Sequence, residues 1–572
     1  MDDSHNFGFM LGAQAENLWQ KQYGITAYGL ISPDHPEVDL TTGLVWNSGT
    51  QQWEKKELSP YGSRNSWSTA GFFGRFNYDY LGRYLLEANL RYDGTSRYRG
   101  NLRWNLYPSV SLGWNIAKEA FMEPYEHTVS TLKIRGSYGE LGNQNTNGWY
   151  PTYLTFSPTV NGGAWLQNGQ KTTTIGVPTA ITTELTWEKV RNWNVGLDWA
   201  LLDNRLTGSF DYYTRYTIDM MGASVELPSI LGYTPPKTNN TDLKTYGWEF
   251  EIAWQDRLRN GFTYSAKFLL SDAQTVVTRY PSNTTGSIDQ YIAGEKIGNI
   301  WGYETVGIAQ SQEQMNAHLD QLDENYFNHN GYFPSESRQG QSALGSGWGA
   351  GDIMYADLDG DGRISAGERT MQNHGDLKVL GNNTPRYQFG IDLNAAWYGV
   401  DLRIFFQGVM KRDYWQGSSY FWGANTDDTW SAALTQHLDF WRDENSLLVQ
   451  RGIMEANTDA YYPRPSFDRG GKYGRNHQPQ SRYLQNAAYI RLKNLQIGYT
   501  FPDKWMSKAH IEKLRLYFSA ENIWTGTSLV KMFDPETLDG GNYNLEKDWR
   551  TLNNGNAYPL SMQLSCGLSI TF

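Results

Sequence analysis

Hydrophobic and polar positions alternate along much of the chain, and the alternation is clearest at the C-terminal end. In the last ten residues every second side chain is apolar: Leu564, Cys566, Leu568, Ile570 and Phe572. Glycine or small polar residues occupy the positions between them. Because successive side chains of a strand point to opposite faces, this pattern predicts a strand with one apolar face. A soluble sandwich strand has the same pattern, so the number, length and joining of such strands decide the fold class.

Two such strands follow each other near residue 200. Residues 193–199 alternate Trp, Val, Leu and Trp with Asn, Gly and Asp, and residues 206–213 return with a similar alternation after a short turn. Each arm reaches roughly ten residues, the length that a tilted strand needs to cross the hydrocarbon layer. The polar face carries Asp198 and Asp211. A dry sandwich core would exclude these charges, whereas a water-filled lumen would accept them.

The same hairpin unit recurs along the chain. Further pairs are 71–78 with 84–92, 246–254 with 262–270, and 387–397 with 401–409. The pattern predicts about 14 strands and places their boundaries to within several residues. No helical periodicity of any length is visible, and only residues 116–131 are predicted to hold a short helix.

Short turns alternate with long polar connections. The predicted long loops are 18–65, 140–184, 220–242, 275–384, 411–486 and 525–556. In transmembrane barrels the periplasmic turns are short and the extracellular loops are long. If the turn at 202–205 is periplasmic, alternation places every long loop outside and the C-terminus at the periplasmic face. The sequence therefore predicts an all-β, antiparallel transmembrane β-barrel in the outer membrane of a Gram-negative bacterium.

Composition agrees with this prediction. The 572 residues carry a net charge of −11, which argues against a nucleic-acid binder. Mean hydropathy is −0.61, and no apolar run is long enough for a membrane helix. A barrel tolerates this because only every second strand residue faces lipid. The single cysteine, Cys566, excludes an intrachain disulfide, and its apolar setting disfavours a nucleophilic thiolate.

Residues 1–6 lack the basic start and apolar core of a signal peptide. An outer-membrane protein needs one for secretion. Either the predicted location is wrong or the beginning of the protein is missing, and we expect the second.

Several strings are recognisable as a set. They are residues 90–98, 107–114, 132–139 with 142–144, 204–213, 489–495 with 498–499, 519–524 and 534–536. In this order they closely resemble the SusC/RagA family of TonB-linked (TonB-dependent) outer-membrane proteins. The resemblance covers nearly the whole chain, to Phe572.

This resemblance implies a plugged barrel of about 22 strands that imports large nutrients, usually glycans and sometimes peptides. It also implies energy from the inner-membrane TonB system, a SusD-like surface lipoprotein as a lid, and a terminal strand read by the barrel-assembly machinery. Residues 1–572 contain no plug domain and no TonB box, and about eight strands are absent. Open sheet edges are costly in lipid, so we expect the C-terminal part of a barrel, which would not transport alone.

One motif carries metal chemistry. Residues 357–368 fit the twelve-residue calcium loop, with Gly362 at the sharp turn. The predicted ligands are Asp357, Asp359, Asp361, the carbonyl of Arg363, Ser365 and Glu368. An Asp- and Gly-rich turn without a metal is the alternative. No EF-hand helices are apparent around it, so we expect a structural Ca²⁺ that orders the longest loop, 275–384, as a docking surface for the lipoprotein.

The loops are also rich in aromatic residues, for example Trp149, Tyr150, Trp415, Tyr420, Phe421 and Trp422. Such residues suit stacking on sugars or packing of the loops against one another, and the sequence leaves both open. No substrate-binding residue is assigned. Nothing marks a catalytic pair among the carboxylates or histidines, so we expect no enzyme.

Two other classes share part of this pattern. A passive porin or adhesin barrel has the same strands but not the ordered family strings. A soluble, calcium-binding, carbohydrate-associated β-protein would explain residues 357–368 and the aromatics. That third class predicts two packed sheets, each strand having one face free of charge.

Overall fold

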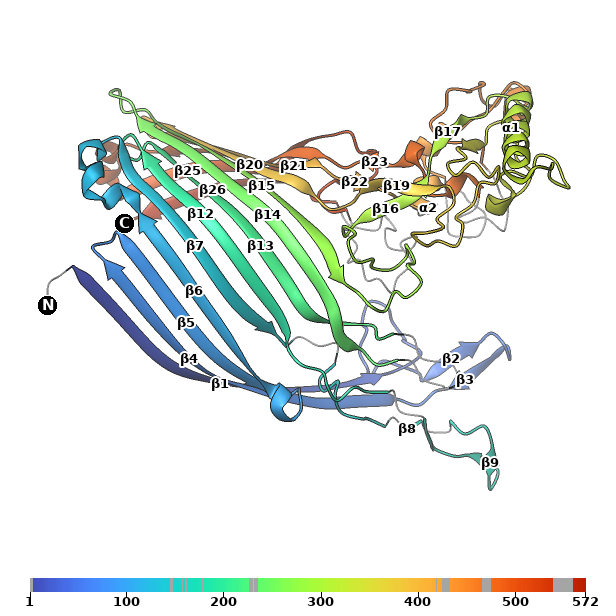
Figure 1. Ribbon diagram of the computed structural model, residues 1–572, viewed down its shortest axis with the longest axis horizontal. Helices are drawn as coiled ribbons and strands as arrows, with labels where there is room; N and C mark the ends of the chain where they lie inside the picture. Colours follow the sequence, from blue (N-terminus) through green and yellow to red (C-terminus); the bar gives the residue numbers. More distant parts are fainter. Residues whose placement is uncertain are drawn as a thin grey trace.

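One large sheet organises the molecule. The computed structural model describes residues 4–144, 148–156, 158–159, 162–176, 180–225, 230, 235–417, 419–423, 433–465, 475–538 and 559–572. Within them, fourteen strands form one sheet whose spatial order follows the sequence (Figure 1). They are β1 (His5–Thr26), β4 (Ser59–Tyr80), β5 (Tyr84–Thr95), β6 (Trp104–Asn115), β7 (Val129–Asn143), β12 (Glu188–Leu201), β13 (Leu206–Gly222), β14 (Thr238–Arg257), β15 (Thr263–Arg279), β20 (Arg386–Trp397), β21 (Val400–Lys411), β24 (Tyr489–Thr500), β25 (Lys513–Thr527) and β26 (Gln563–Thr571). The predicted strand number and fold class are confirmed. We call this sheet the wall.

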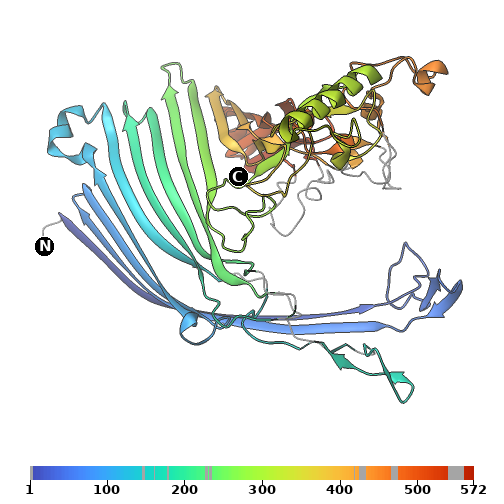
Figure 2. The same cartoon turned by 45° about the vertical axis from the view of Figure 1, so that its right-hand side comes forward.

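The wall is strongly curved (Figures 1 and 2). The short turns and both termini lie at one end in Figure 1, and the long connections gather at the other. Every neighbouring pair is antiparallel, from β1 with β4 to β25 with β26. In the described part of the chain β1 and β26 are the two edges. The six predicted long loops therefore leave the same end of the wall, as predicted, whereas the intermediate connections 116–128 and 501–512 lie at the end of the short turns.

The two-residue turn between β20 and β21 shows why the hairpins close where they do. Trp397 pairs with Val400, so Tyr398 and Gly399 alone form the turn. Both have positive φ, 45° and 85°, which matches the right-handed twist of a hairpin. A Cβ on Gly399 would lie 2.4 Å from the carbonyl oxygen of Thr500, so glycine is required there.

The two faces of the wall differ in chemistry. On one face large apolar side chains are exposed, including Val195 at 60% and Leu568 at 57%. On the other face Arg135 of β7 donates to Asp198 of β12 at 3.0 Å and to Asp211 of β13 at 2.6 Å. Such cross-strand ion pairs recur on this face: Lys267–Glu251, Arg403–Asp392 and Arg515–Asp401. The predicted alternation of apolar and charged faces thus holds across the wall.

The first predicted loop, 18–65, is wrong in its bounds. Strands β1 and β4 pair without interruption from His5 opposite Tyr80 to Thr26 opposite Ser59, so the connection is 27–58. The outer half of this ribbon is exposed on both faces, so its polar residues hide the alternation that marks a half-buried strand. A small hairpin, β2 (Leu44–Asn47) with β3 (Gln52–Lys55), lies at its tip (Figure 1).

The prediction of no helix beyond residues 116–131 is also wrong. Helix α1 (Gln312–Asn330) has 19 residues, begins after the N-cap Ser311 and ends at Gly331 with φ of 80°. Its buried apolar residues are only Met315, Leu319 and Leu322, set among polar side chains, so the apolar stripe is too narrow to stand out. The stretch 116–131 contains two short 3₁₀ turns, Ile116–Lys118 and Ala120–Tyr125.

The remaining strands and α-helices are short. They are β8 (Pro158–Thr159), β9 (Leu166–Gln167), β10 (Gln170–Lys171), β11 (Thr174–Ile175), β16 (Asn299–Tyr303), β17 (Thr305–Ile308), β18 (Ile353–Tyr355), β19 (Leu377–Asn382), β22 (Asp413–Tyr414), β23 (Gln485–Asn486), α2 (Ser419–Trp422), α3 (Leu447–Gln450) and α4 (Asp503–Met506). None of the helices in the described residues has the length and apolar character to cross a membrane.

Candidate metal centre in the loop domain

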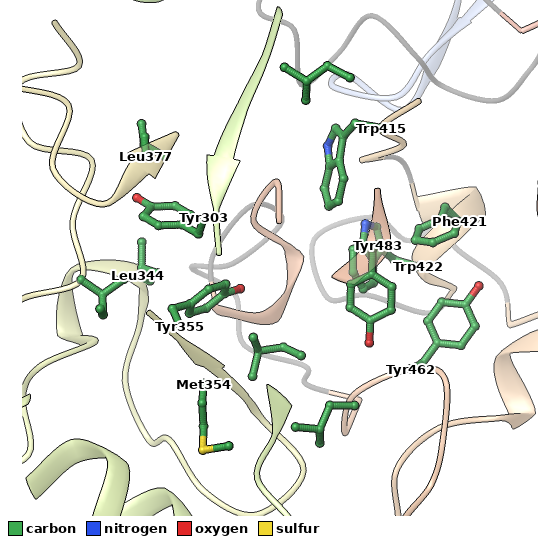
Figure 3. Packing of buried hydrophobic residues seen from close by; sticks show 14 of the residues in the cluster. Tyr303, Leu344, Met354, Tyr355, Leu377, Trp415, Phe421, Trp422, Tyr462 and Tyr483 are labelled. Atoms are coloured by element: carbon green, nitrogen blue, oxygen red, sulfur yellow. The ribbon is translucent and has the colours of Figure 1, made fainter. Parts of the chain in front are cut away.

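Three long connections pack into one globular unit beyond the end of the wall. We call the described residues of 280–385, 412–488 and 528–538 the loop domain. Its buried core is rich in aromatic rings (Figure 3) and includes Tyr303, Met315, Ile353, Tyr355, Ile364, Tyr414, Phe421 and Tyr483. Segments more than 100 residues apart in sequence thus share one hydrophobic core.

A buried carboxylate ties two of these connections together. Asp352 is fully buried and accepts from Arg464 and Arg475, each at 2.7 Å, and from Asn476 at 3.0 Å. A buried charge is stable only when it is paired and hydrogen-bonded, and Asp352 meets both conditions. The first connection is therefore fixed to the second independently of any metal.

The loop aromatics mostly pack rather than face solvent. Trp415, Phe421 and Trp422 are buried in the core of the loop domain, and Phe421 is 0% exposed. Tyr420 keeps an exposed ring, while Trp149 and Tyr150 are half-buried outside this domain. Of the two interpretations that the sequence left open, packing applies to the three buried rings.

Residues 357–368, here called the aspartate loop, wrap around a cluster of oxygens. The carboxylate oxygens of Asp357, Asp359 and Asp361 lie within 4.8 Å of one another. Backbone N–H groups hold them: Gly360 and Gly362 donate to Asp357 at 2.8 and 3.0 Å. Arg363 donates its N–H to Asp361 at 2.6 Å. The tight turn uses positive φ at Gly362, where a Cβ would meet the carbonyl oxygen of Leu322 in α1 at 2.3 Å.

Positive charge is turned away from this cluster. The Arg363 guanidinium stacks over the Tyr326 ring at 4.5 Å and lies 3.7 Å from Asp323, so it faces α1. Burial, with the nearby charges of Asp359 and Asp357, raises the pKa of Asp361. Within the described ranges no ion pair compensates Asp357, Asp359 or Asp361, so a bound cation would stabilise all three.

Of the four predicted carboxylate ligands, the structure brings together three, Asp357, Asp359 and Asp361. Glu368 is exposed and lies outside the aspartate cluster, and its N–H donates to Asn373 at 3.0 Å. The Ser365 hydroxyl accepts from Gly367 at 3.1 Å. The clustered donors are all hard carboxylate oxygens, the ligands that Ca²⁺ takes, so the residues present fit this ion.

Sequence reasoning missed Asp376. This side chain is fully buried beside the aspartate loop and accepts from the N–H of Leu358 at 2.6 Å and of Ser365 at 2.8 Å. Burial raises the pKa of its carboxyl to about 7, with a further contribution from Asp359 and Asp357. Asp376 lies beyond the twelve-residue motif, so no ligand spacing could have revealed it.

The wall has one apolar face and one charged face, and its long connections form the loop domain. These two features together are typical of one class of membrane barrel. A family model described as TonB dependent receptor-like, beta-barrel matches residues 2–523. The chain therefore belongs to the TonB-dependent receptor β-barrel family. Proteins of this family are outer-membrane β-barrels that act as receptors and transporters rather than as enzymes.

Individual relatives refine this placement. The chain is 28% identical over 531 residues to TonB-dependent receptor P3 of Formosa agariphila, covering 90% of this chain and 46% of that protein. It is 26% identical over 540 residues to TonB-dependent receptor SusC of Bacteroides thetaiotaomicron, covering 93% of this chain and 46% of SusC. The chain thus spans about half the length of the relatives it matches.

Solved structures show the same fold. The RagAB peptide transporter superposes with a TM-score of 0.68 at 19% identity, covering 100% of this chain and 54% of that chain. The RagAB peptide importer in its open-open state gives the same TM-score at 18% identity. The comparisons confirm the predicted resemblance to SusC/RagA-type TonB-dependent receptors.

Proposed function

We propose that this chain forms part of the wall of a TonB-dependent importer that carries large nutrients, oligosaccharides or peptides, across the outer membrane. The observation that carries the proposal is the single curved sheet with exposed apolar side chains on one face and ion pairs on the other. Lipid would cover the apolar face, and the charged face would line a wet lumen. On that face Arg75, Arg91 and Asp93 border an open hollow of about 900 Å³.

The orientation and partners are part of this proposal. The loop domain faces the outside, where a SusD-like lipoprotein would dock, and the short turns and the C-terminus face the periplasm. TonB would supply energy through parts of the importer outside residues 1–572. The exposed apolar side chains of β26 would meet lipid and be recognised by the barrel-assembly machinery, as we expect from Leu564 to Phe572.

The alternatives differ in specific ways. A soluble carbohydrate-associated protein would pack two sheets, whereas the fourteen long strands of the described residues form one. A passive porin or adhesin shares the wall but not the ordered family strings, and energy-dependent uptake would separate an importer from it by experiment.

Growth experiments in the bacterium that produces the protein test the proposal. Disruption of the gene should abolish growth on one class of oligosaccharide or peptide while growth on the corresponding monomers is unchanged. Collapse of the inner-membrane proton gradient should stop uptake of the same nutrient into wild-type cells. Uptake that continues without the gradient would identify a passive pore instead.

We further propose that the aspartate loop binds Ca²⁺ and thereby orders the loop domain for docking. Three converging carboxylates without a basic partner support this proposal. Limited proteolysis of the detergent-solubilised protein in Ca²⁺ or EGTA tests it, with Asp359→Asn as the site variant. Ca²⁺ should protect the wild type and not the variant, and EGTA should weaken lipoprotein binding. If EGTA changes neither proteolysis nor complex formation, the calcium proposal is wrong.

A further inference from the structure

We infer that Asp376 is the positioning residue of the cation site, fixing the two arms of the aspartate loop at the separation that the ion requires. This inference rests on the proposed calcium site and concerns a residue outside its motif. Each oxygen of the Asp376 carboxylate receives one backbone N–H: Leu358 donates to one at 2.6 Å and Ser365 to the other at 2.8 Å.

The two anchored residues lie on opposite arms of the loop. Leu358 stands between Asp357 and Asp359, which provide the first two carboxylates of the cluster. Ser365 lies on the returning arm. A single rigid carboxylate that bonds both arms therefore sets the width of the loop, and full burial of Asp376 leaves it no alternative partner in water.

The segment that carries Asp376 also braces the returning arm directly. Asp376 donates its own N–H to the Ser365 carbonyl at 2.9 Å, and Asn373 accepts from Glu368 at 3.0 Å. Gly375 permits this close approach, because a Cβ there would lie 2.5 Å from the Ser365 carbonyl oxygen. Asn373–Asp376 thus runs along the loop as a fixed support.

This arrangement separates positioning from ligation. Asp376 is not among the converging carboxylates, and each of its oxygens accepts one N–H, so the ion would bind to the three clustered aspartates. Asparagine at position 376 has one acceptor oxygen, so it can hold only one of the two arms. The loop should still form, because Asp357, Asp359 and Asp361 keep their internal hydrogen bonds.

The test is calorimetric titration of Ca²⁺ into the detergent-solubilised protein, for wild type, Asp376→Asn and Asp413→Asn. Asp413 is a matched control in the same domain, because it accepts a backbone N–H from Asn382 at 2.9 Å, outside the aspartate loop. Asp376→Asn should raise the calcium Kd at least tenfold. The Kd of Asp413→Asn should equal that of the wild type.

Protease resistance of the loop domain without Ca²⁺ distinguishes positioning from general support. If Asp376 positions the site, the calcium-free Asp376→Asn variant is as resistant to protease as the calcium-free wild type, but it binds Ca²⁺ more weakly. Lower resistance with an unchanged Kd would show a merely structural role and overturn the inference. Gly375→Ala, which displaces the support, should also raise the Kd. If neither variant forms a resistant loop domain while Asp413→Asn does, the inference is likewise overturned.

The outcomes also separate this inference from the calcium proposal. No binding by the wild type would overturn both. Binding by the wild type with an unchanged Kd in Asp376→Asn would overturn only the role of Asp376.

Discussion

The wall and the loop domain contain the same kinds of aromatic and aliphatic side chain, but the wall exposes many of them and the loop domain buries them. In the wall, large apolar side chains such as Val195 and Leu568 lie exposed, and the backbone is held by long antiparallel ladders. In the loop domain, rings such as Phe421 and Tyr483 are buried against one another. This difference is what the proposed function requires of a wall that meets lipid on its apolar face and of a loop domain that is surrounded by water.

We expect the largest effect from a substitution in the core of the loop domain, which should unfold that domain and leave the wall intact. Phe421→Ala should destabilise the loop domain by about 3–5 kcal/mol, because it leaves a cavity where the ring is fully buried. Limited proteolysis should show cleavage in the loop domain, while the folded wall keeps its heat-modifiable migration on gels. Tyr398→Ala, at an exposed turn position, is the control and should leave the loop domain resistant. Equal resistance of both variants would contradict the assigned core.

A charge placed on each face of one strand sharpens the contrast within the wall. Val195→Arg, on the apolar face near the middle of β12, should cost about 2–4 kcal/mol in a bilayer. Asn194→Arg, on the charged face of the same strand, should be tolerated. Unfolding in urea from lipid vesicles measures both. If the two variants were equally stable, the apolar face would not contact lipid.

Removal of Ca²⁺ should affect only the loop domain. At a Ca²⁺ concentration one hundredfold above its Kd, binding stabilises the folded domain by about 2.7 kcal/mol. EGTA should therefore lower the melting temperature of the loop domain and leave that of the wall unchanged. A shift of the wall transition, or no shift at all, would contradict the location of the cation site.

The smallest effect concerns the charged face. Arg135→Met removes the bonds to Asp198 and Asp211, and the cost should be on the order of 1 kcal/mol or less, because about a third of Arg135 is exposed to solvent screening. Adding Asp198→Asn and Asp211→Asn to this variant should recover most of the lost free energy of unfolding. Urea unfolding of the three proteins checks this. A loss of several kcal/mol would indicate a dry interior rather than a wet lumen.

The wall was predictable because its information is local. Alternation in 193–199 and 206–213 predicts the hairpin β12–β13, and Tyr398-Gly399 predicts the turn that follows β20. The failure at β1 and β4 has the same origin. Their outer halves are exposed on both faces, so burial imposes no alternation there.

The loop domain was not predictable in this way, because its contacts join distant segments. Asp352 meets Arg464 and Arg475 more than 100 residues along the chain, and no periodic pattern marks such a contact. Helix α1 has recognisable caps at Ser311 and Gly331. Its apolar stripe is so narrow, however, that its sequence resembles that of a polar loop. The three aspartates of the motif were readable from spacing, whereas Asp376 is defined only by the folded chain.

The central claim is that the wall separates an external loop domain from periplasmic turns. The most direct test is labelling of intact cells with a membrane-impermeant maleimide, after Cys566→Ser has removed the single thiol of residues 1–572. We predict that Glu336→Cys, in the loop domain, reacts on intact cells. Arg259→Cys, in the turn between β14 and β15, should react only after the outer membrane is permeabilised. Reaction of Arg259→Cys on intact cells, or protection of Glu336→Cys, would contradict the account.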